Sequence, residues 1–251
     1  MPRPVALRLD PEREEAELRA YLGATYDRHR LERYEQTLAE ELASIHHEHH
    51  FYRTSQAYLY NLTAFAMTGT KLPYLDLLTS RVPPGSRVLD YGCGIGSDGL
   101  MLLEAGYRVE FADFDNPSTA YLRWRLERRS LDAPIRDLDG VVPGGFDAAY
   151  AFDVIEHVSD PYAFLGEMER RAALILVNLL EFDPHEQALH RELPIADLLR
   201  YMARYDLEHY AILHGTSHLV LYRPEAAAPL RRLWNRGRIA AQRWRQRSGA
   251  G

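Results

Sequence analysis

A short apolar stretch, Arg87 to Tyr91, leads directly into three closely spaced glycines, Gly92, Gly94 and Gly96. Glycine has no side chain, so such a segment can turn tightly and let its backbone approach a ligand. A second apolar stretch ends at Asp113, about 20 residues further on, where nucleotide-binding α/β sheets place an acid for ribose hydroxyls. A strand, a glycine loop, a helix and an acid in this order predict a site for an adenosine-containing cofactor.

The elements around this loop follow two patterns. Apolar residues recur at helical spacing in residues 11–45, where Gly23 is expected to break the helix, and again in residues 52–66. After Pro83-Pro84-Gly85, apolar strand patterns alternate with helical ones. The expected strands are 87–91, 107–112, 146–152, 173–179, 207–213 and 218–222. Helical crossovers predict a mainly parallel, doubly wound α/β sheet, and the short connection His214–Ser217 predicts an antiparallel C-terminal hairpin.

Composition limits the class of protein. The chain has 251 residues, 46% hydrophobic and 26% charged, which is typical of globular domains. Its longest apolar stretch, Ala172 to Leu180, is too short to span a bilayer, and its single cysteine excludes an internal disulfide. We therefore expect a cytoplasmic protein with no membrane association. The predicted parts are a helical cap or lid over residues 1–80, a cofactor-binding domain over 81–224 and a basic helical tail over 225–251.

Charge is distributed unevenly along the chain. The tail from Ala226 to Gly251 has seven arginines and no acid. The whole chain has a net charge of −6, so the chain without its tail has a net charge of −13. This net negative charge argues against a nucleic acid as the partner. The tail also has an apolar stripe at helical spacing: Leu230, Leu233, Trp234, Gly237, Ala241 and Trp244. We expect this helix to pack on its own domain or on a partner subunit, such as the second copy of a homodimer.

Two segments carry a family resemblance. Val88 to Gly96 resembles motif I of the class I S-adenosylmethionine-dependent methyltransferases, and Phe146 to Pro161 resembles the fourth-strand segment of their small-molecule branch. The resemblance covers roughly residues 73 to 222 and implies a Rossmann-like, seven-stranded sheet. It departs after the fifth strand of that fold, since residues 181–191 match no pattern we assign. The Pro-Gly-Gly turn that usually precedes this strand is also replaced, by Glu169-Arg170-Arg171-Ala172.

The resemblance also implies roles for individual residues. The glycines would admit the methionine part of S-adenosylmethionine, Asp90 would orient its ammonium, and Asp113 would take the ribose hydroxyls. Phe114 would flank the adenine, with Asp137 and Leu138 facing its exocyclic edge. The expected cofactor contacts are Asp90, Gly92, Gly94, Gly96, Asp113, Phe114, Asp137, Leu138 and Asp153. Cys93 is interpreted as a small residue among glycines, because no base is indicated beside it.

Residues on the acceptor's side are predicted from position. Aromatic rings at Tyr52, Tyr58 and Tyr60 could line the substrate pocket, where they would stabilise a sulfonium, or could be helix core. His157 follows the fourth strand and is predicted to be the catalytic base. The run His46-His47-Glu48-His49-His50 lacks the spacing of a zinc motif, so no metal ligand is predicted.

These observations predict methyl transfer from S-adenosylmethionine to a small molecule, by in-line displacement. Three alternatives stay open at this point. The arginine tail could recruit RNA as the methyl acceptor. A second glycine register, Gly94, Gly96 and Gly99, would suit a nicotinamide-dependent oxidoreductase. The chain could also be a catalytically silent protein that binds the cofactor.

Overall fold

A computed structural model describes residues 6–44, 51, 53–182 and 190–248 of the chain. The chain divides into two compact units, Met1–Val142 and Pro143–Gly251. Each unit is described separately below. The division at residue 142 follows the packing of the chain and does not test the predicted boundaries at residues 80 and 224, which stay predictions.

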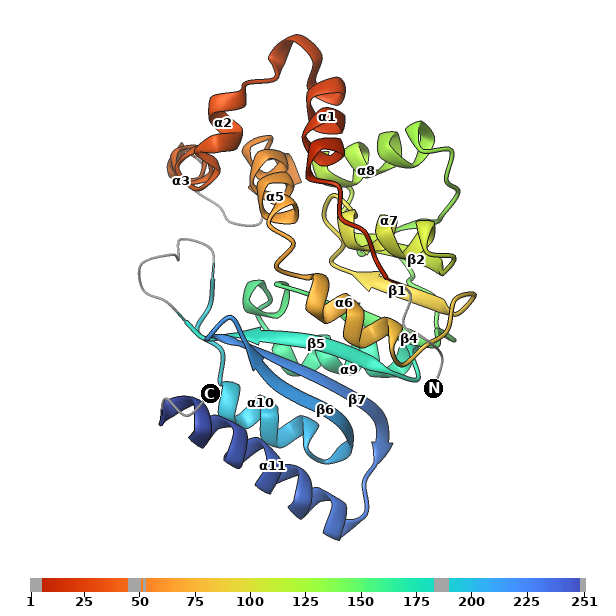
Figure 1. Cartoon of the computed structure of the whole chain (residues 1–251), viewed down its shortest axis with the longest axis vertical. Helices are drawn as coiled ribbons and strands as arrows, with labels where there is room; N and C mark the ends of the chain where they lie inside the picture. The colour runs from red at the N-terminus through yellow and green to blue at the C-terminus, as the bar shows by residue number, and fades with distance from the viewer. Residues whose placement is uncertain (1–5, 45–50, 52, 183–189, 249–251) are drawn as a thin grey trace. The chain divides into compact units, whose positions relative to one another are not determined.

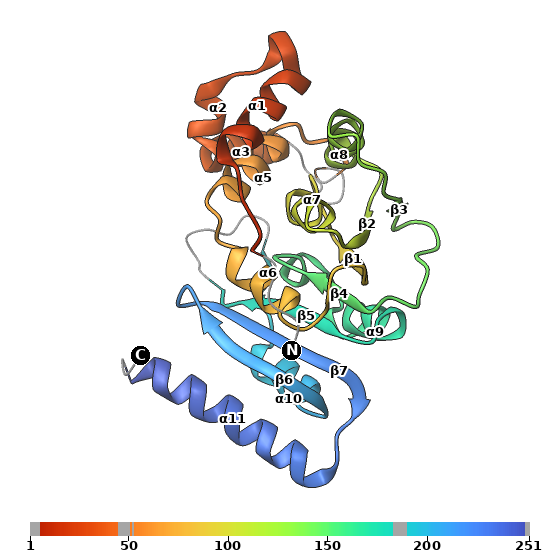
Figure 2. The same ribbon diagram turned by 45° about the vertical axis from the view of Figure 1, so that its right-hand side comes forward.

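The first unit begins with helices: α1 (Pro11–Leu22), η1 (Gly23–Thr25), α2 (Arg28–Glu32), α3 (Tyr34–Ser44), α5 (Ala57–Met67) and α6 (Leu72–Thr79). Of these, α1, α2, α3 and α5 gather in one cluster (Figure 2). Asp10 caps α1 by accepting a hydrogen bond from the Arg13 N–H, and Gly23 ends the helix at φ 55°. The predicted break at Gly23 is therefore confirmed. The core of this cluster includes Leu18, Leu59 and Tyr60.

Three parallel strands complete the first unit. They are β1 (Arg87–Tyr91), β2 (Arg108–Asp113) and β3 (Ile135–Asp137), in the order β3-β2-β1, joined through α7 (Ser97–Glu104) and α8 (Pro117–Arg128). β1 lies where the sequence predicts it, whereas β3 has only three residues and was not among the expected strands. The register pairs Asp113 with Asp137, so both carboxylates stand at the carboxyl ends of neighbouring strands.

The described residues of the second unit form four strands, which Figure 1 labels β4 to β7. They are β4 (Ala148–Ala151), β5 (Ile175–Leu180), β6 (Tyr205–Leu213) and β7 (Ser217–Ala226), in the order β4-β5-β7-β6. Its helices are η2 (Ile155–His157), α9 (Pro161–Arg171), α10 (Ile195–Met202) and α11 (Pro229–Arg247). β4 and β5 are parallel, and β7 is antiparallel to both β5 and β6. The antiparallel C-terminal hairpin is thus confirmed, with His214 and Gly215 at positive φ in its turn.

The described residues therefore supply seven strands, linked mostly by helices, which confirms the α/β, Rossmann-like fold class. Helices precede the first strand, as predicted for the N-terminal part, although their role as a lid stays a prediction. Among the described residues, no helix combines the length and apolar character needed to cross a bilayer.

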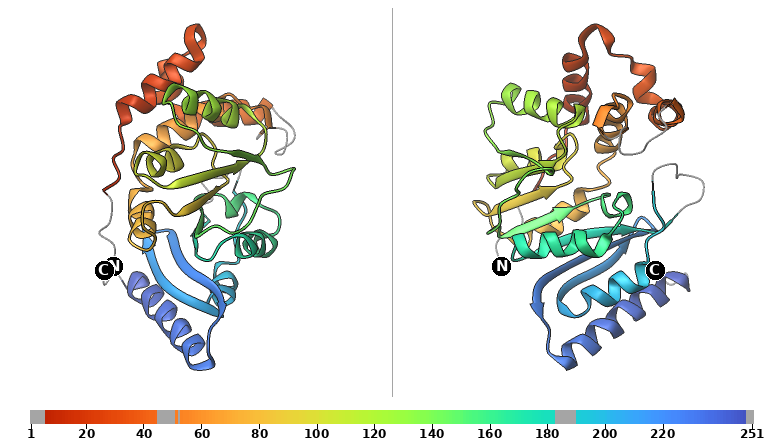
Figure 3. Two further views of the ribbon diagram at one scale, coloured as in Figure 1. Left: turned by 90° about the vertical axis from the view of Figure 1, so that its right-hand side faces the viewer. Right: turned by 180° about the vertical axis from the view of Figure 1, so that it is seen from behind.

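The tail forms one helix, α11, which runs along β6 (Figure 3). Its buried side carries Asn235 and Ile239, and the Asn235 amide donates to the Ala203 and Tyr205 carbonyls. The helix therefore packs on its own unit, as expected. The predicted apolar stripe does not make this contact, because its large side chains, Leu230, Leu233, Trp234 and Trp244, are 51% to 82% exposed. The helix therefore faces its unit with Asn235 and Ile239, and the predicted stripe faces away from it.

Candidate cofactor and acceptor sites

The glycine loop has a backbone that only glycine adopts readily. Gly92, Gly94 and Gly96 have φ values of 80°, 52° and 72°, all in the left-handed region. The loop is tied to the neighbouring strand, because the N–H groups of Gly92 and Cys93 both donate to the Ala112 carbonyl, at 2.8 and 3.2 Å. Side chains are therefore excluded by conformation at three alternate positions, which leaves bare main chain at the carboxyl end of β1.

Asp113 closes the loop from the end of β2. One carboxylate oxygen accepts a hydrogen bond from the Gly94 N–H and the other accepts one from the Phe114 N–H, each at 2.7 Å. Burial raises the pKa of Asp113 to about 6, although both N–H groups act to lower it. Each oxygen keeps a second lone pair, so a fixed carboxylate can still accept two hydroxyls. This is the geometry that the predicted ribose role requires.

The residues after β3 lie beside Asp113. The Leu138 N–H donates to the Asp113 carbonyl at 3.0 Å, which fixes the turn that carries Asp137 and Leu138. Phe114 is half-buried, and the Arg53 guanidinium lies 4.7 Å from its ring centroid while donating to the Asp139 carboxylate. The structure therefore brings Asp113, Phe114, Asp137 and Leu138 together. Arg53 joins them from the N-terminal segment, in the run Phe51-Tyr52-Arg53 that the sequence suggests for the acceptor pocket rather than for the adenine side.

Gly99 distinguishes the two glycine registers. It lies in α7 rather than in the loop, and a Cβ there would stand 2.3 Å from the Phe111 ring and 2.8 Å from the Asp90 carboxylate. Gly99 is therefore required for packing α7 on β1 and β2, whereas Gly92 begins the loop. Asp90 is buried at the end of β1. Burial, together with Asp113 and Asp90, raises the pKa of the Cys93 thiol well above its ordinary value, which disfavours a nucleophilic thiolate.

A buried ion-pair network fixes the back of the loop. Arg125 of α8 is fully buried and donates to the Ile95 carbonyl and the Ser97 hydroxyl, both at 2.9 Å, and to the Glu17 carboxylate at 2.8 Å. Glu14 of α1 accepts from Arg125 and, at 2.7 Å, from Ser97. Helix α1 is thereby joined to the residues at the end of the glycine loop.

Arg129 completes the network by pairing with both glutamates. Burial raises the pKa of Glu17, but hydrogen bonds and charge from Arg129 and Arg125 outweigh it, and the pKa is lowered. The network was not predicted. Its signal is the spacing of Glu14 and Glu17 on one helix and of Arg125 and Arg129 on another, because residues three or four apart share a helix face.

The predicted aromatic pocket is only partly described. Tyr52 lies outside the described residues. Tyr60 is 1% exposed, and its hydroxyl accepts from the Asp27 N–H at 3.0 Å, so it is a core residue of the helical cluster. Tyr58 is half-buried and meets Phe51 edge-on at 6.0 Å between ring centroids. A substrate contact stays a prediction for Tyr58.

In the second unit, Asp153 follows β4 with a φ of 55°, which is rare for a residue with a side chain. Its N–H donates to the Asn178 side-chain oxygen at 2.8 Å, and the Asn178 amide donates back to its carboxylate at 2.6 Å and to Ser217 at 3.1 Å. Asn178 of β5 thus holds the turn after β4. The cofactor role predicted for Asp153 stays a prediction.

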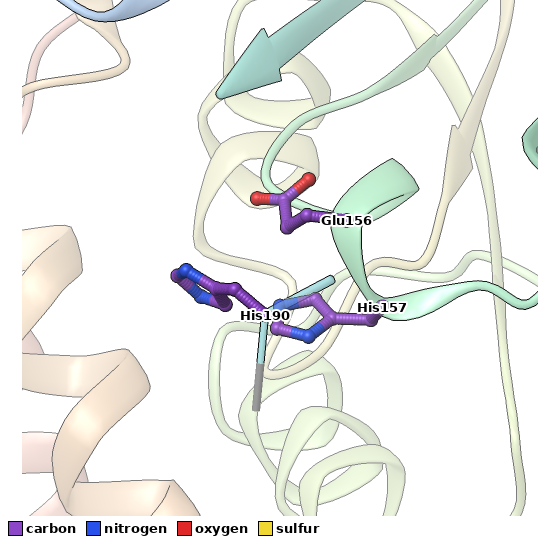
Figure 4. A group of neighbouring side chains, drawn as sticks. All are labelled: Glu156, His157 and His190. Carbon is purple, nitrogen blue, oxygen red and sulfur yellow. The ribbon is translucent and has the colours of Figure 1, made fainter. Parts of the chain in front are cut away.

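His157 lies four residues beyond Asp153, in η2. Its ring meets the ring of His190 edge-on, with 4.8 Å between centroids, and the Glu156 carboxylate lies beside both (Figure 4). Glu156 directly precedes His157 in the chain, whereas His190 is a neighbour that no sequence pattern joins to His157. Its role as a base stays a prediction, while the His46–His50 run and His185 lie outside the described residues.

A second histidine also lies at this end of the sheet. His218, at the start of β7, is fully buried between the Tyr210 hydroxyl at 2.8 Å and the Glu181 carboxylate at 2.9 Å. Burial lowers its pKa, although Glu181 acts to raise it. Sequence reasoning missed this histidine, because it sits inside a strand rather than after one.

Comparisons with known proteins agree with this geometry. The family described as "Methyltransferase domain" matches residues 66–217, more than half of the chain. A ubiquinone biosynthesis O-methyltransferase of Xanthomonas campestris pv. campestris is 34% identical over 97 residues, which are 36% of this chain and 41% of the relative. A cypemycin N-terminal methyltransferase of a Streptomyces species is 30% identical over 123 residues, which are 42% of this chain and 47% of the relative. The chain thus matches less than half the length of either relative.

A solved structure extends the fold comparison over most of the chain. The magnesium protoporphyrin IX methyltransferase of Synechocystis PCC 6803, solved with bound S-adenosylmethionine, superposes with a TM-score of 0.51 at 16% identity. The superposition covers 86% of this chain and 98% of that chain. At this identity the likeness concerns the fold alone. None of the proteins named here is a nicotinamide-dependent oxidoreductase.

Proposed function

Because the chain belongs to the class I S-adenosylmethionine-dependent methyltransferases, we propose that it methylates a small molecule bound at the carboxyl ends of its strands. S-adenosylmethionine is its cofactor, and when bound it supplies a methyl group on a positively charged sulfur. The acceptor class and the roles of individual residues are the parts proposed here.

The observation that carries the residue assignments is the hydrogen bond from Gly94 to Asp113. It holds a half-buried carboxylate against side-chain-free backbone, so a ribose can reach the acid while an adjoining chain lies along the loop. In this proposal Asp113 accepts the ribose hydroxyls, and Phe114, Asp137 and Leu138 lie at the adenine. Asp90 orients the ammonium at the base of the loop.

Support for a small acceptor comes from charge and from the relatives. Outside the tail the chain carries −13, which repels the phosphates that a nucleic-acid enzyme must hold. The similar proteins are named for ubiquinone biosynthesis, for a peptide N-terminus and for magnesium protoporphyrin IX. None of these names is a nucleic acid.

The arginine tail gives little support to RNA as the acceptor. Arg231 pairs with Asp206 at 3.1 Å, Arg232 donates to the Ala227 carbonyl and Arg238 donates to the Glu208 carbonyl. These three arginines are occupied within their own unit. RNA recruitment would have to break such contacts or rely on the remaining arginines.

The test is product identification. The full chain is incubated with methyl-labelled S-adenosylmethionine and a fractionated extract, and the labelled product is isolated. We expect label in a compound below the size of a macromolecule, and loss of that label with Asp113→Ala. Asp115→Ala is the matched control, since Asp115 is exposed two residues further along. Label found only in RNA would refute a small acceptor.

A further inference from the structure

Three side chains with metal-ligating atoms converge after β4. Glu156 and His157 lie on η2, and His190 comes from the segment before α10 (Figure 4). One ligand atom from each residue lies within 4.8 Å of the other two. Glu156 is 1% exposed, whereas both histidines are half-buried.

The convergence is held by the main chain. The Arg191 N–H donates to the Glu156 carbonyl at 2.8 Å, so the residue after His190 is bonded to the residue before His157. The His157 N–H in turn donates to the Val154 carbonyl at 3.0 Å and keeps η2 in shape. The three side chains therefore start from a fixed backbone rather than from separate mobile loops.

We propose that Glu156, His157 and His190 bind a divalent transition-metal ion, with Zn²⁺ the best match. Two imidazoles and one carboxylate are a ligand set that zinc takes at catalytic sites. Ligands of tetrahedral zinc stand ~3.3 Å apart, since each is ~2 Å from the ion. Side-chain rotations that bring the ligand atoms up to about 1.5 Å closer complete the site.

The three side chains together offer one carboxylate and two imidazoles, and the donor atoms converge on one point. Three protein ligands leave a fourth position open, as in catalytic rather than structural zinc sites.

The ligand class rests on the proposed function. A divalent ion with one open position binds the oxygen of a hydroxyl compound and lowers the pKa of that hydroxyl, so that its proton passes to water and the oxygen stays on the ion as an anion. No oxidant or reductant is needed. The ligand expected at this ion is therefore a hydroxyl compound.

This proposal gives His157 a different role from the base that the sequence predicts. An imidazole nitrogen that holds a metal ion has no lone pair left for a proton at that atom. The two roles consequently differ in one measurable property. A metal ligand must contribute to ion affinity in the absence of any acceptor.

The experiment measures that affinity on the full chain without an affinity tag. His46, His47, His49 and His50 are first changed to Gln, since that run could bind ions by itself. Co²⁺, a spectroscopic substitute for Zn²⁺, is titrated while visible absorption is recorded, and Zn²⁺ competition gives its affinity. We expect one ion per chain and the absorption of a low-symmetry, nitrogen- and oxygen-ligated ion.

Three substitutions then test the ligands: His190→Ala, His157→Asn and Glu156→Gln. Each should weaken binding of the ion by more than roughly 100-fold, because loss of a residue that only hydrogen-bonds to a ligand already lowers metal affinity about 10- to 100-fold. His29→Ala, on an exposed histidine in α2, is the matched control and should bind as the parent does. Circular dichroism shows which variants fold, and the half-buried His190 tests the idea even if the Glu156 variant fails to fold.

Two results would overturn the proposal: a parent protein that binds neither Co²⁺ nor Zn²⁺, or a folded His190→Ala that binds both unchanged. S-adenosylmethionine affinity, measured on the same samples, separates this inference from the proposed function. Cofactor binding without ion binding would refute the metal site and leave the proposed function unaffected. Ion binding without cofactor binding would refute the proposed function and support the metal site.

Discussion

The carboxyl ends of β1 and β4 present different kinds of chemical group. At β1 the groups are main-chain N–H and C=O in a glycine loop, together with one carboxylate, Asp113. At β4 they are side chains, with Asp153 held by Asn178, and Glu156 and His157 beside His190. The first end is formed by consecutive residues and one neighbouring strand, whereas the second needs residues from three separate segments.

This difference suggests a division of labour. A backbone site recognises what is constant in a family, since the main chain offers the same groups whatever the sequence. A side-chain site can be altered one residue at a time, so it suits what varies. We therefore expect damage at β1 to affect cofactor binding, and damage at β4 to affect turnover of the acceptor.

The largest expected effect is on the network behind the β1 loop. Arg125→Met leaves the buried Glu14 and Glu17 without their central cation, which should cost about 3–5 kcal/mol of unfolding free energy. Urea unfolding measures the loss. Arg123→Met, on the same helix but half exposed and 3.9 Å from Asp115, should stay within about 0.5 kcal/mol. Equal losses in the two variants would show that the loop does not depend on the network.

A substitution at β4 should separate rate from cofactor affinity. His157→Asn removes the imidazole, whether it acts as base or as metal ligand, and should lower kcat by a factor on the order of 100. Affinity for S-adenosylmethionine, measured by calorimetry, should stay within about threefold. A parallel fall in both quantities would mean that the β4 end also shapes the cofactor site, and the proposed division would fail.

The reciprocal substitution is at β1. Asp113→Ala removes the acceptor of two ribose hydroxyls and should weaken cofactor binding by about 2 kcal/mol, or roughly 30-fold. Calorimetry of the variant against Asp115→Ala isolates the effect, because Asp115 is exposed and lies outside the loop. Unchanged affinity would remove the ribose role from Asp113.

The smallest predicted effect is a pH dependence that belongs to β1. Asp113 has a raised pKa of about 6 in the free protein, and only its ionised form accepts two hydroxyls. As pH falls through 6 the carboxyl group becomes protonated, so cofactor affinity should drop roughly tenfold between about pH 7.5 and 5. Titration calorimetry across this range measures the drop. In Asp113→Asn the same part of the profile should be flat.

Most of the fold follows from local patterns in the sequence. The helix break at Gly23, the strand 87–91 and the hairpin turn at Gly215 each depend on neighbouring residues, so their patterns survive in one chain. Strand β3 was not predicted, because three residues are too few to show an alternating pattern. The face of α11 was misjudged for another reason: Asn235 satisfies two carbonyls and so occupies the buried side in place of the tryptophans.

The candidate sites divide in the same way. The glycine loop and Asp113 could be predicted, since only one helix and one strand, α7 and β2, separate them along the chain. His190 could not be linked to His157, because 33 residues separate them and nothing in the sequence gives the path between. Arg125 and Glu14 are 111 residues apart and meet only through the packing of α1 on α8. Long-range partners of this kind require the folded chain.

The distribution of tryptophans gives the protein a built-in optical reporter. Trp234 and Trp244 stand 51% and 67% exposed on α11, whereas Trp124 is half-buried on α8 with Tyr21 of α1 at 5.6 Å between ring centroids. A water-soluble quencher such as iodide therefore reaches two of the three fluorophores preferentially. The emission that remains comes mainly from Trp124, so its wavelength follows whether α1 stays docked on α8 while cofactor is added or removed.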